Sequence, residues 1–284
     1  MRFALSRIVI LLSLLILPVS AKAETPRRII SLAPSITESL YYLGAEKELI
    51  AVSSYCNYPE GARQKEIVGT LTNPNIEKIF SLSPDLVLAV EGLNRTQTIE
   101  KLKSLGIKIE VFDAGDSFDD VVKNFVQLGR LIGKEDKAEE IVEQVKKQIK
   151  SINNRLKGRW RPQVFWQVGA RPLVGAGEKS FANEFIRYGG GENIFSDTAA
   201  RYPRLSREEV LSRNPDVVIL VTMGDITEKE KEYWQKFKDL SAAKARRIYI
   251  VDADKVCRPT PVSFLTGLKQ VARVLHPEVF AQER

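Results

Sequence analysis

The stretch from Phe118 to Lys157, in the middle of the chain, constrains the fold more than any other. Apolar residues recur in it every three or four positions, the spacing of helices that bury one face. Gly133 and the polar residues after it interrupt the pattern. We therefore expect a short helix and then a second helix of about 23 residues, roughly 35 Å long. A helix of that length can join two globular units and resists bending, so little closure is expected when a ligand binds.

The sequence before this stretch resembles the sequence after it. At an offset of 131 positions, Ser83–Leu88 aligns with Asn214–Ile219, and Glu77 aligns with Glu208. Both halves alternate short apolar runs with helical segments, which predicts parallel sheets covered by helices. A unit of this size can have its own core. We predict an α/β protein with two Rossmann-like lobes on parallel sheets and a ligand cleft between them, divided into an N-terminal lobe (24–117), a helical linker (118–157) and a C-terminal lobe (158–284).

The first 23 residues form a separate segment. Arg2 and Arg7 precede an apolar run that extends from Ile8 to Leu17, and small residues precede Glu24. This arrangement is typical of a cleavable signal peptide, and the run is shorter than the ~20 residues that a membrane span needs. We expect cleavage near Ala23-Glu24 and a periplasmic location, with an uncleaved membrane anchor as the alternative.

Charge, histidine and cysteine counts narrow the function. Without the first 23 residues the formal net charge falls from +7 to +4, and the basic residues alternate with acidic ones, which does not favour nucleic-acid binding. The single histidine, His276, is too few for a histidine-rich metal site, and we expect it to cap a helix. Cys56 and Cys257 lie in opposite halves, and either a disulfide or two thiols is compatible with an oxidising compartment.

Ligands of open α/β sheets bind at the carboxyl ends of the strands, so the loops there are expected to line the cleft. We interpret 169–177 as one such loop, and Ser35–Glu38 as a capping box at the start of a helix. The second half also places four arginines in these loops. A guanidinium fork matches the carboxylates or phosphates of a ligand, although a solvated rim is the alternative for Arg171, Arg201, Arg204 and Arg258.

Six segments together resemble the helix-linked (class III) periplasmic substrate-binding proteins of ABC importers, most closely the cobalamin-binding members. They are Ile29–Glu38, Val52–Pro59, Ser83–Val87, Leu105–Lys108, Gly190–Phe195 and Ser206–Val210. The resemblance covers nearly all of the chain after residue 23. It implies a receptor that holds a large cofactor between two rigid lobes and delivers it to a permease dimer in the inner membrane. We expect a monomer that is not an enzyme.

The resemblance also implies a set of ligand-binding residues. These are Pro34, Tyr55, Tyr58, Leu71, Val90, Val174, Tyr202 and Arg258. Flat aromatic side chains suit the broad, mostly apolar ring of a corrinoid. The cobalamin-binding members carry aromatic residues at the positions of Leu71, Val90 and Val174, so the wall of the cleft is smaller here. We expect a corrinoid, with a ferric siderophore or haem as the alternative.

Two glutamates are expected to contact the permease. The internal repeat places Glu77 and Glu208 in register, and the resemblance implies that such a pair meets arginines of the permease. Exposed carboxylates at symmetric points suit a two-fold partner with basic pockets. The alternative, which is compatible with docking, is that each glutamate is favoured by the dipole of its own helix.

An extracytoplasmic hydrolase is the competing class of function. Asp225 and Asp254 are both expected near the cleft and could act as a carboxylate pair. The chain lacks a Gly-x-Ser-x-Gly sequence, and its one histidine is far from the expected cleft loops. These features favour a binding protein over an enzyme.

Overall fold

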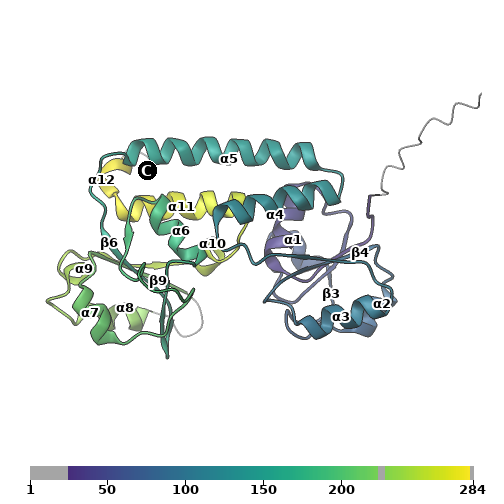
Figure 1. Cartoon of the computed structure of the whole chain (residues 1–284), viewed down its shortest axis with the longest axis horizontal. Helices are drawn as coiled ribbons and strands as arrows, with labels where there is room; N and C mark the ends of the chain where they lie inside the picture. Colours follow the sequence, from purple (N-terminus) through teal and green to yellow (C-terminus); the bar gives the residue numbers. More distant parts are fainter. Residues whose placement is uncertain (1–24, 223–227, 282–284) are drawn as a thin grey trace, which may run out of the picture.

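The computed structural model describes residues 25–222 and 228–281, which form two lobes beneath a long helix (Figure 1). The expected signal peptide and Asp225 lie outside the described residues. Within the described chain, no helix combines the length and the apolar character needed to cross a bilayer.

The N-terminal lobe is built on a five-stranded sheet in the order β3-β2-β1-β4-β5. Every pair of neighbouring strands is parallel. The side chains of β1 alternate between its faces, so Ile29 packs with α1 and the linker helices while Ile30 packs with α2 and α3. The elements are β1 (Ile29–Ser31), α1 (Pro34–Tyr42), β2 (Leu49–Val52), the 3-10 helix η1 (Glu60–Gln64), β3 (Glu66–Ile67), α2 (Ile76–Ser81), β4 (Leu86–Val90), α3 (Thr96–Ser104) and β5 (Ile109–Phe112).

The C-terminal lobe has a second sheet in the order β10-β9-β6-β7, and β8 also pairs with β6. A large aromatic and aliphatic core, which includes Trp166, Phe185 and Phe264, packs under α6 and α11. The elements are β6 (Gln163–Ala170), β7 (Leu173–Gly175), α6 (Phe181–Tyr188), β8 (Glu192–Asn193), α7 (Arg207–Arg213), β9 (Val217–Val221), α8 (Glu228–Gln235), α9 (Ser241–Lys244), β10 (Ile248–Val251), α10 (Ala253–Val256), α11 (Pro261–Leu275) and α12 (Pro277–Phe280).

Two details of the sequence interpretation are wrong. Residues 169–177 are not a loop, because β7 runs antiparallel to β6 after the two-residue turn Arg171-Pro172, the connection that an antiparallel pair permits. The second sheet is therefore mixed, although the α/β two-lobe fold is confirmed. The capping box is also absent from α1, because Pro34 takes the first helical position and Ala33 is the N-cap without a side-chain hydrogen bond. Ser35 and Glu38 consequently lie inside the helix.

The linker forms two antiparallel helices, α4 (Phe118–Leu131) and α5 (Glu135–Leu156). The chain reverses at Gly133, which has a positive φ of 70° and so adopts the left-handed conformation that glycine permits. A Cβ at Gly129 would lie 2.6 Å from the Cβ of Ala138, so this glycine allows α4 and α5 to approach closely. The predicted long helix is confirmed by α5, which has 22 residues.

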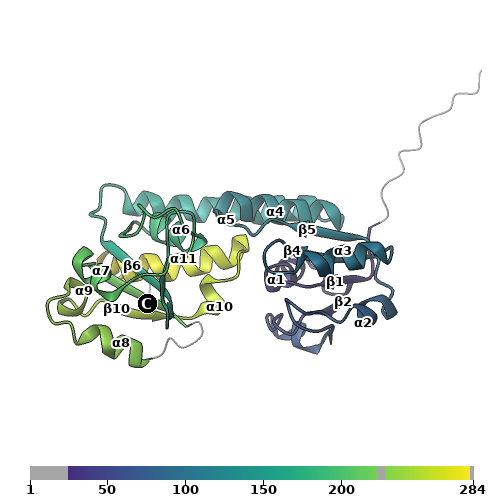
Figure 2. The ribbon, with the colours of Figure 1, turned by 60° about the horizontal axis from the view of Figure 1, so that its bottom comes forward.

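Helix α5 belongs to the cores of both lobes. Its first half places Ala138 and Val142 against the N-terminal sheet, and its second half places Val145 and Ile149 against the C-terminal lobe. Figure 2 shows α4 and α5 along the same side of the molecule, above both sheets. His276 is the C-cap of α11, so the predicted helix cap is confirmed. Its Nε2 atom lies 3.1 Å from the Gly190 carbonyl oxygen.

Candidate ligand-binding site

The junction between the lobes brings an aromatic loop and an arginine together. Tyr55 and Tyr58 lie in the loop after β2 and expose 58% and 49% of their surface. Arg258, between α10 and α11, is 7% exposed. Its Nη2 atom donates a hydrogen bond of 2.7 Å to Asn57 Oδ1, and its Cζ atom lies 5.2 Å from the centre of the Tyr58 ring. Two residues expected at the ligand therefore meet from opposite lobes.

Arg258 also has two acidic neighbours. Its Nη2 atom donates to Asp254 Oδ1 at 2.8 Å, and its Nη1 atom lies 3.8 Å from Glu38 Oε2. Asp254, at 64% side-chain exposure, remains largely in solvent, whereas the side chain of Glu38 is 2% exposed. Asp254, considered above as a possible catalytic carboxylate, is thus paired with an arginine.

The sequence interpretation placed Glu38 in a helix cap and did not predict that it belongs to the junction. Glu38 projects from α1 toward the C-terminal lobe, where the Ser263 hydroxyl of α11 donates to Glu38 Oε1. The Tyr42 hydroxyl donates to the same oxygen at 2.9 Å. Burial is the main cause that raises the pKa of Glu38, and the Ser263 and Tyr42 hydrogen bonds and the Arg258 charge oppose it. The signal in the sequence was the four-residue spacing of Glu38 and Tyr42, which places both on one face of a helix.

Asn94, a residue that we did not single out in the sequence, brings Leu71 and Val90 together. Asn94 Oδ1 accepts from the Val90 backbone N–H at 2.8 Å, and Asn94 Nδ2 donates to the Leu71 carbonyl oxygen at 2.8 Å. A third bond reaches the Leu32 carbonyl oxygen at 3.3 Å, two residues before Pro34. Asn94 thus ties together the ends of β1 and β4 and the Leu71 loop. Val90 is only 3% exposed, so it presents little surface to a ligand.

Tyr202 approaches the junction from the C-terminal lobe. It is 46% exposed, and desolvation raises the pKa of its hydroxyl to about 12. The neighbouring Arg201 forms an ion pair with Asp116, which precedes α4. Val174 is half-buried in β7 and bridges to Arg204. Among the four arginines noted in the sequence, Arg258 is buried, while the other three are exposed.

The two cysteines are separate thiols in the described chain. Cys56 is buried, with its sulfur 3.2 Å from Ser53 Oγ. Desolvation raises the pKa of Cys56, and it raises the pKa of Cys257 to about 11. Both groups are therefore protonated at neutral pH.

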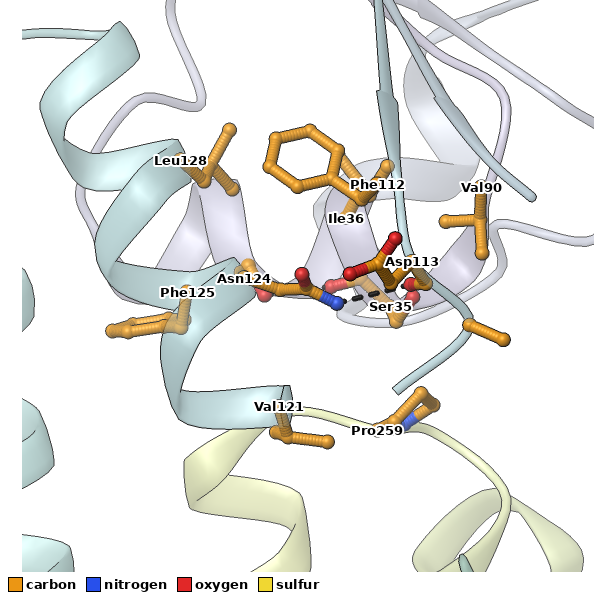
Figure 3. A pocket seen from close by; sticks show the side chains of 12 residues that line it. Ser35, Ile36, Val90, Phe112, Asp113, Val121, Asn124, Phe125, Leu128 and Pro259 are labelled. Carbon is orange, nitrogen blue, oxygen red and sulfur yellow. Dashed lines mark hydrogen bonds between the residues drawn. The ribbon is translucent and has the colours of Figure 1, made fainter. Parts of the chain in front are cut away.

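A cavity of about 20 Å³ is lined by residues of both lobes and of α4 (Figure 3). Its lining combines Ser35 and Val90 of the N-terminal lobe, Val121 of α4 and Pro259 of the C-terminal lobe, and Asn124 beside it donates to the Asp113 carbonyl oxygen at 3.0 Å. This volume suits a single water molecule. A large ligand therefore does not fit inside this cavity.

Residues 29–255 match the family model described as "Periplasmic binding protein". The chain belongs to the periplasmic binding protein family. A vitamin B12-binding protein of Yersinia pseudotuberculosis is 33% identical to it over 227 residues, which cover 80% of this chain and 79% of that protein. The crystal structure of a periplasmic vitamin B12-binding protein of Vibrio cholerae matches with a TM-score of 0.75 and 29% identity, covering 91% of this chain and 99% of the other.

Another solved structure shows that the same fold occurs in a protein described as binding a different ligand. A possible iron-binding, periplasmic solute-binding protein of Staphylococcus epidermidis matches with a TM-score of 0.80 and 31% identity, covering 89% of this chain and 100% of the other. The proteins of this family bind substrates and are not enzymes, so this periplasmic binding protein is a substrate-binding protein of the ABC-importer type. The hydrolase alternative is therefore wrong.

The two glutamates expected to face the permease occupy equivalent places in this periplasmic binding protein. Glu77 and Glu208 are exposed in the first turns of α2 and α7. Asn75 and Ser206 cap these helices with side-chain hydrogen bonds of 2.9 and 3.1 Å to the third helical N–H. Figures 1 and 2 place α2 and α7 in opposite lobes, both away from α5.

Proposed function

We propose that this protein captures a corrinoid, cobalamin or a related compound, in the periplasm and delivers it to an ABC importer. The observation that carries the proposal is the meeting of exposed Tyr58 with Arg258 at the lobe junction. The 33% identity to a vitamin B12-binding protein supports it.

The chemistry of the junction suits this ligand. A corrin ring is broad and mostly apolar, and amide groups surround its edge. The exposed rings of Tyr55, Tyr58 and Tyr202 offer flat apolar area with a polar tip. The Arg258 guanidinium can donate hydrogen bonds to amide oxygens at the ligand edge. The other proposed contacts are Pro34, Leu71, Val90 and Val174, which are smaller and less exposed.

The test uses the purified protein without residues 1–23. It is titrated separately with cyanocobalamin and with dicyanocobinamide, and calorimetry measures the heat of binding. A one-to-one complex with either compound is expected. Haemin and a ferric siderophore serve as competing ligands. The corrinoid proposal would be contradicted if haemin or the ferric siderophore bound while neither corrinoid produced heat or changed the melting temperature.

A ferric siderophore or haem is the second candidate ligand. The observation that favours it is that Leu71, Val90 and Val174 are aliphatic. These side chains offer a corrin ring less flat contact area than aromatic residues would. The similarity to a possible iron-binding protein is compatible with this candidate.

We also propose that Glu77 and Glu208 dock the receptor, as a monomer, on a permease dimer. Their equivalent positions and exposure suit a two-fold partner that carries arginines. Reversing both charges should abolish uptake in cells while ligand affinity stays unchanged, and weakened affinity would mean that the glutamates support the site or the fold. Intact-mass measurement of the secreted protein tests the proposed cleavage near Ala23-Glu24, and light scattering tests the monomer.

A further inference from the structure

Glu38 is a carboxylate buried between the lobes beneath the proposed ligand contacts. It is 1% exposed. Its Oε1 atom accepts one hydrogen bond from Tyr42 on its own helix and one from Ser263 on α11 of the opposite lobe. Its Oε2 atom is buried without a hydrogen-bond partner among the described residues and lies 3.8 Å from Arg258 Nη1. This oxygen is therefore directed at the arginine that the ligand is proposed to contact.

Such an arrangement is a poor way to gain stability. Burying a charged carboxylate with one unsatisfied oxygen is unfavourable, and well-packed apolar residues often serve as well or better in such places. The raised pKa of Glu38, caused mainly by desolvation, agrees with this reasoning. A buried group that lowers stability calls for a role beyond packing.

The contacts of Arg258 indicate that role. Asn57 and Asp254 both accept from Nη2, and Asp254 is largely in solvent. Glu38 faces the other terminal nitrogen, Nη1, from the buried side. The groups around Glu38 are Tyr42 on α1, Ser263 and Thr260 at the start of α11, and Arg258 in the loop before it. Glu38 is thus in contact with the guanidinium and with the helix that follows it.

We propose that Glu38 is a positioning residue that fixes Arg258 for the ligand. Its Oε2 atom attracts Nη1 of Arg258, and its bond to Ser263 holds the start of α11 against α1, so that the guanidinium stays beside Tyr58 before the ligand arrives. Ordering this side chain in advance lowers the entropy lost on binding. The inference rests on the proposed function, because it assumes that Arg258 contacts the ligand.

The first test is a double-mutant cycle with Glu38→Gln, Arg258→Gln and the double variant. Each protein is titrated with cyanocobalamin, dicyanocobinamide and haemin. For a probe that the unmodified protein binds, Glu38→Gln should weaken affinity by about tenfold, within the range for residues of one network. The double variant should bind no more weakly than Arg258→Gln alone. Additive losses would overturn the proposal.

The matched control is Ser39→Ala, one residue along α1. The Ser39 hydroxyl is buried and donates to the Ser35 carbonyl oxygen at 2.7 Å within the same helix. This variant perturbs the same helix without touching Arg258. It should keep the affinity of the unmodified protein for every probe, and a loss equal to that of Glu38→Gln would mean that any disturbance of α1 is sufficient.

The second test needs no ligand. In ¹⁵N NMR spectra of the ligand-free protein, the Arg258 Nε–H signal is identified by its disappearance in Arg258→Gln. Hydrogen exchange of this group should be slow in the unmodified protein and at least about tenfold faster in Glu38→Gln, because a released guanidinium is open to water. If Glu38→Gln does not fold, Ser263→Ala takes its place. This variant removes the bond from the opposite lobe and should also accelerate the exchange of the Arg258 Nε–H.

The two tests separate this inference from the identity of the ligand. If none of the three probes binds but exchange accelerates in Glu38→Gln, the corrinoid and haem assignments are wrong and the positioning role is supported. If exchange at Arg258 is unchanged, the positioning role is wrong whatever the protein binds.

Discussion

The two lobes share one plan but bring different chemistry to their junction. The N-terminal lobe contributes exposed aromatic rings, Tyr55 and Tyr58, from the loop after β2. The C-terminal lobe contributes one exposed ring, Tyr202, and also Arg258, a buried cation held by Asn57 and Asp254. Aligned positions of the internal repeat, such as Glu77 and Glu208, lie in equivalent places on both lobes. The comparison teaches that the repeated elements determine the frame, while the loops that differ determine what the frame can bind.

The largest effect is expected from the charged side of this comparison. Arg258→Gln should weaken ligand affinity by about 100-fold, which corresponds to about 2.7 kcal/mol and is typical of hydrogen bonds from charged groups. Calorimetric titration measures the loss. Lys101→Gln on the exposed side of α3 is the control, and an equal loss in both variants would show that general charge, not the placed guanidinium, governs binding.

A smaller effect is expected from the aromatic side. Tyr58→Ala should weaken affinity by about tenfold, because the ligand loses one ring face. Tyr58→Phe keeps the ring and should bind almost as well as the unmodified protein. If Tyr58→Ala is more harmful than Arg258→Gln, the aromatic lobe dominates binding and the ranking of the two lobes is reversed.

The docking helices permit a second comparison of the lobes. Beside Glu77, α2 exposes 55% of Phe80. In α7, the residue that the repeat aligns with Phe80 is Leu211, which is instead partly buried against the core of the C-terminal lobe. We therefore expect an additional apolar contact on the N-terminal side alone. Phe80→Ala should raise the receptor concentration needed for half-maximal uptake by about threefold, with Ser81→Ala as the control. Unchanged uptake would mean that both lobes dock through charge alone.

The smallest effect is expected on how stability depends on pH, through Glu38, whose bond to Ser263 joins the lobes. Because burial raises the pKa of Glu38, its contribution to stability is greatest below the pKa of the unfolded chain and is lost as the pH rises through the folded-state pKa. The melting temperature of Glu38→Gln relative to the unmodified protein should therefore be higher at pH 7 than at pH 4.5. Thermal unfolding in matched buffers measures this difference, and a reversed trend would show that Glu38 is stabilised as a carboxylate.

The frame was predictable from the sequence because it depends on regular patterns. The apolar spacing after Gly133 identified α5, and the alternation of short apolar runs with helical segments predicted the two helix-covered sheets. Strand β7 was missed because three residues after a proline turn carry too little alternation to be recognised as a strand.

The junction was only partly predictable, for a different physical reason. Arg258 was expected because the resemblance implies an arginine at this position, in one of the loops that follow strands. Glu38 and Asn94 were not, because their partners lie far away along the chain, at Ser263 and at Leu32. A local pattern contains no information about such contacts. The local pattern placed Glu38 in a capping box, a role that is excluded because Pro34 takes the first helical position.

Helix α5 has a consequence for how the molecule denatures. Because Val142 is embedded in one lobe and Val145 in the other, neither lobe can melt without exposing apolar side chains of the helix that they share. Unfolding of either half removes support from its neighbour, so the lobes should lose their structure in one cooperative transition. A protein that is bipartite in shape is therefore expected to behave as a single thermodynamic unit.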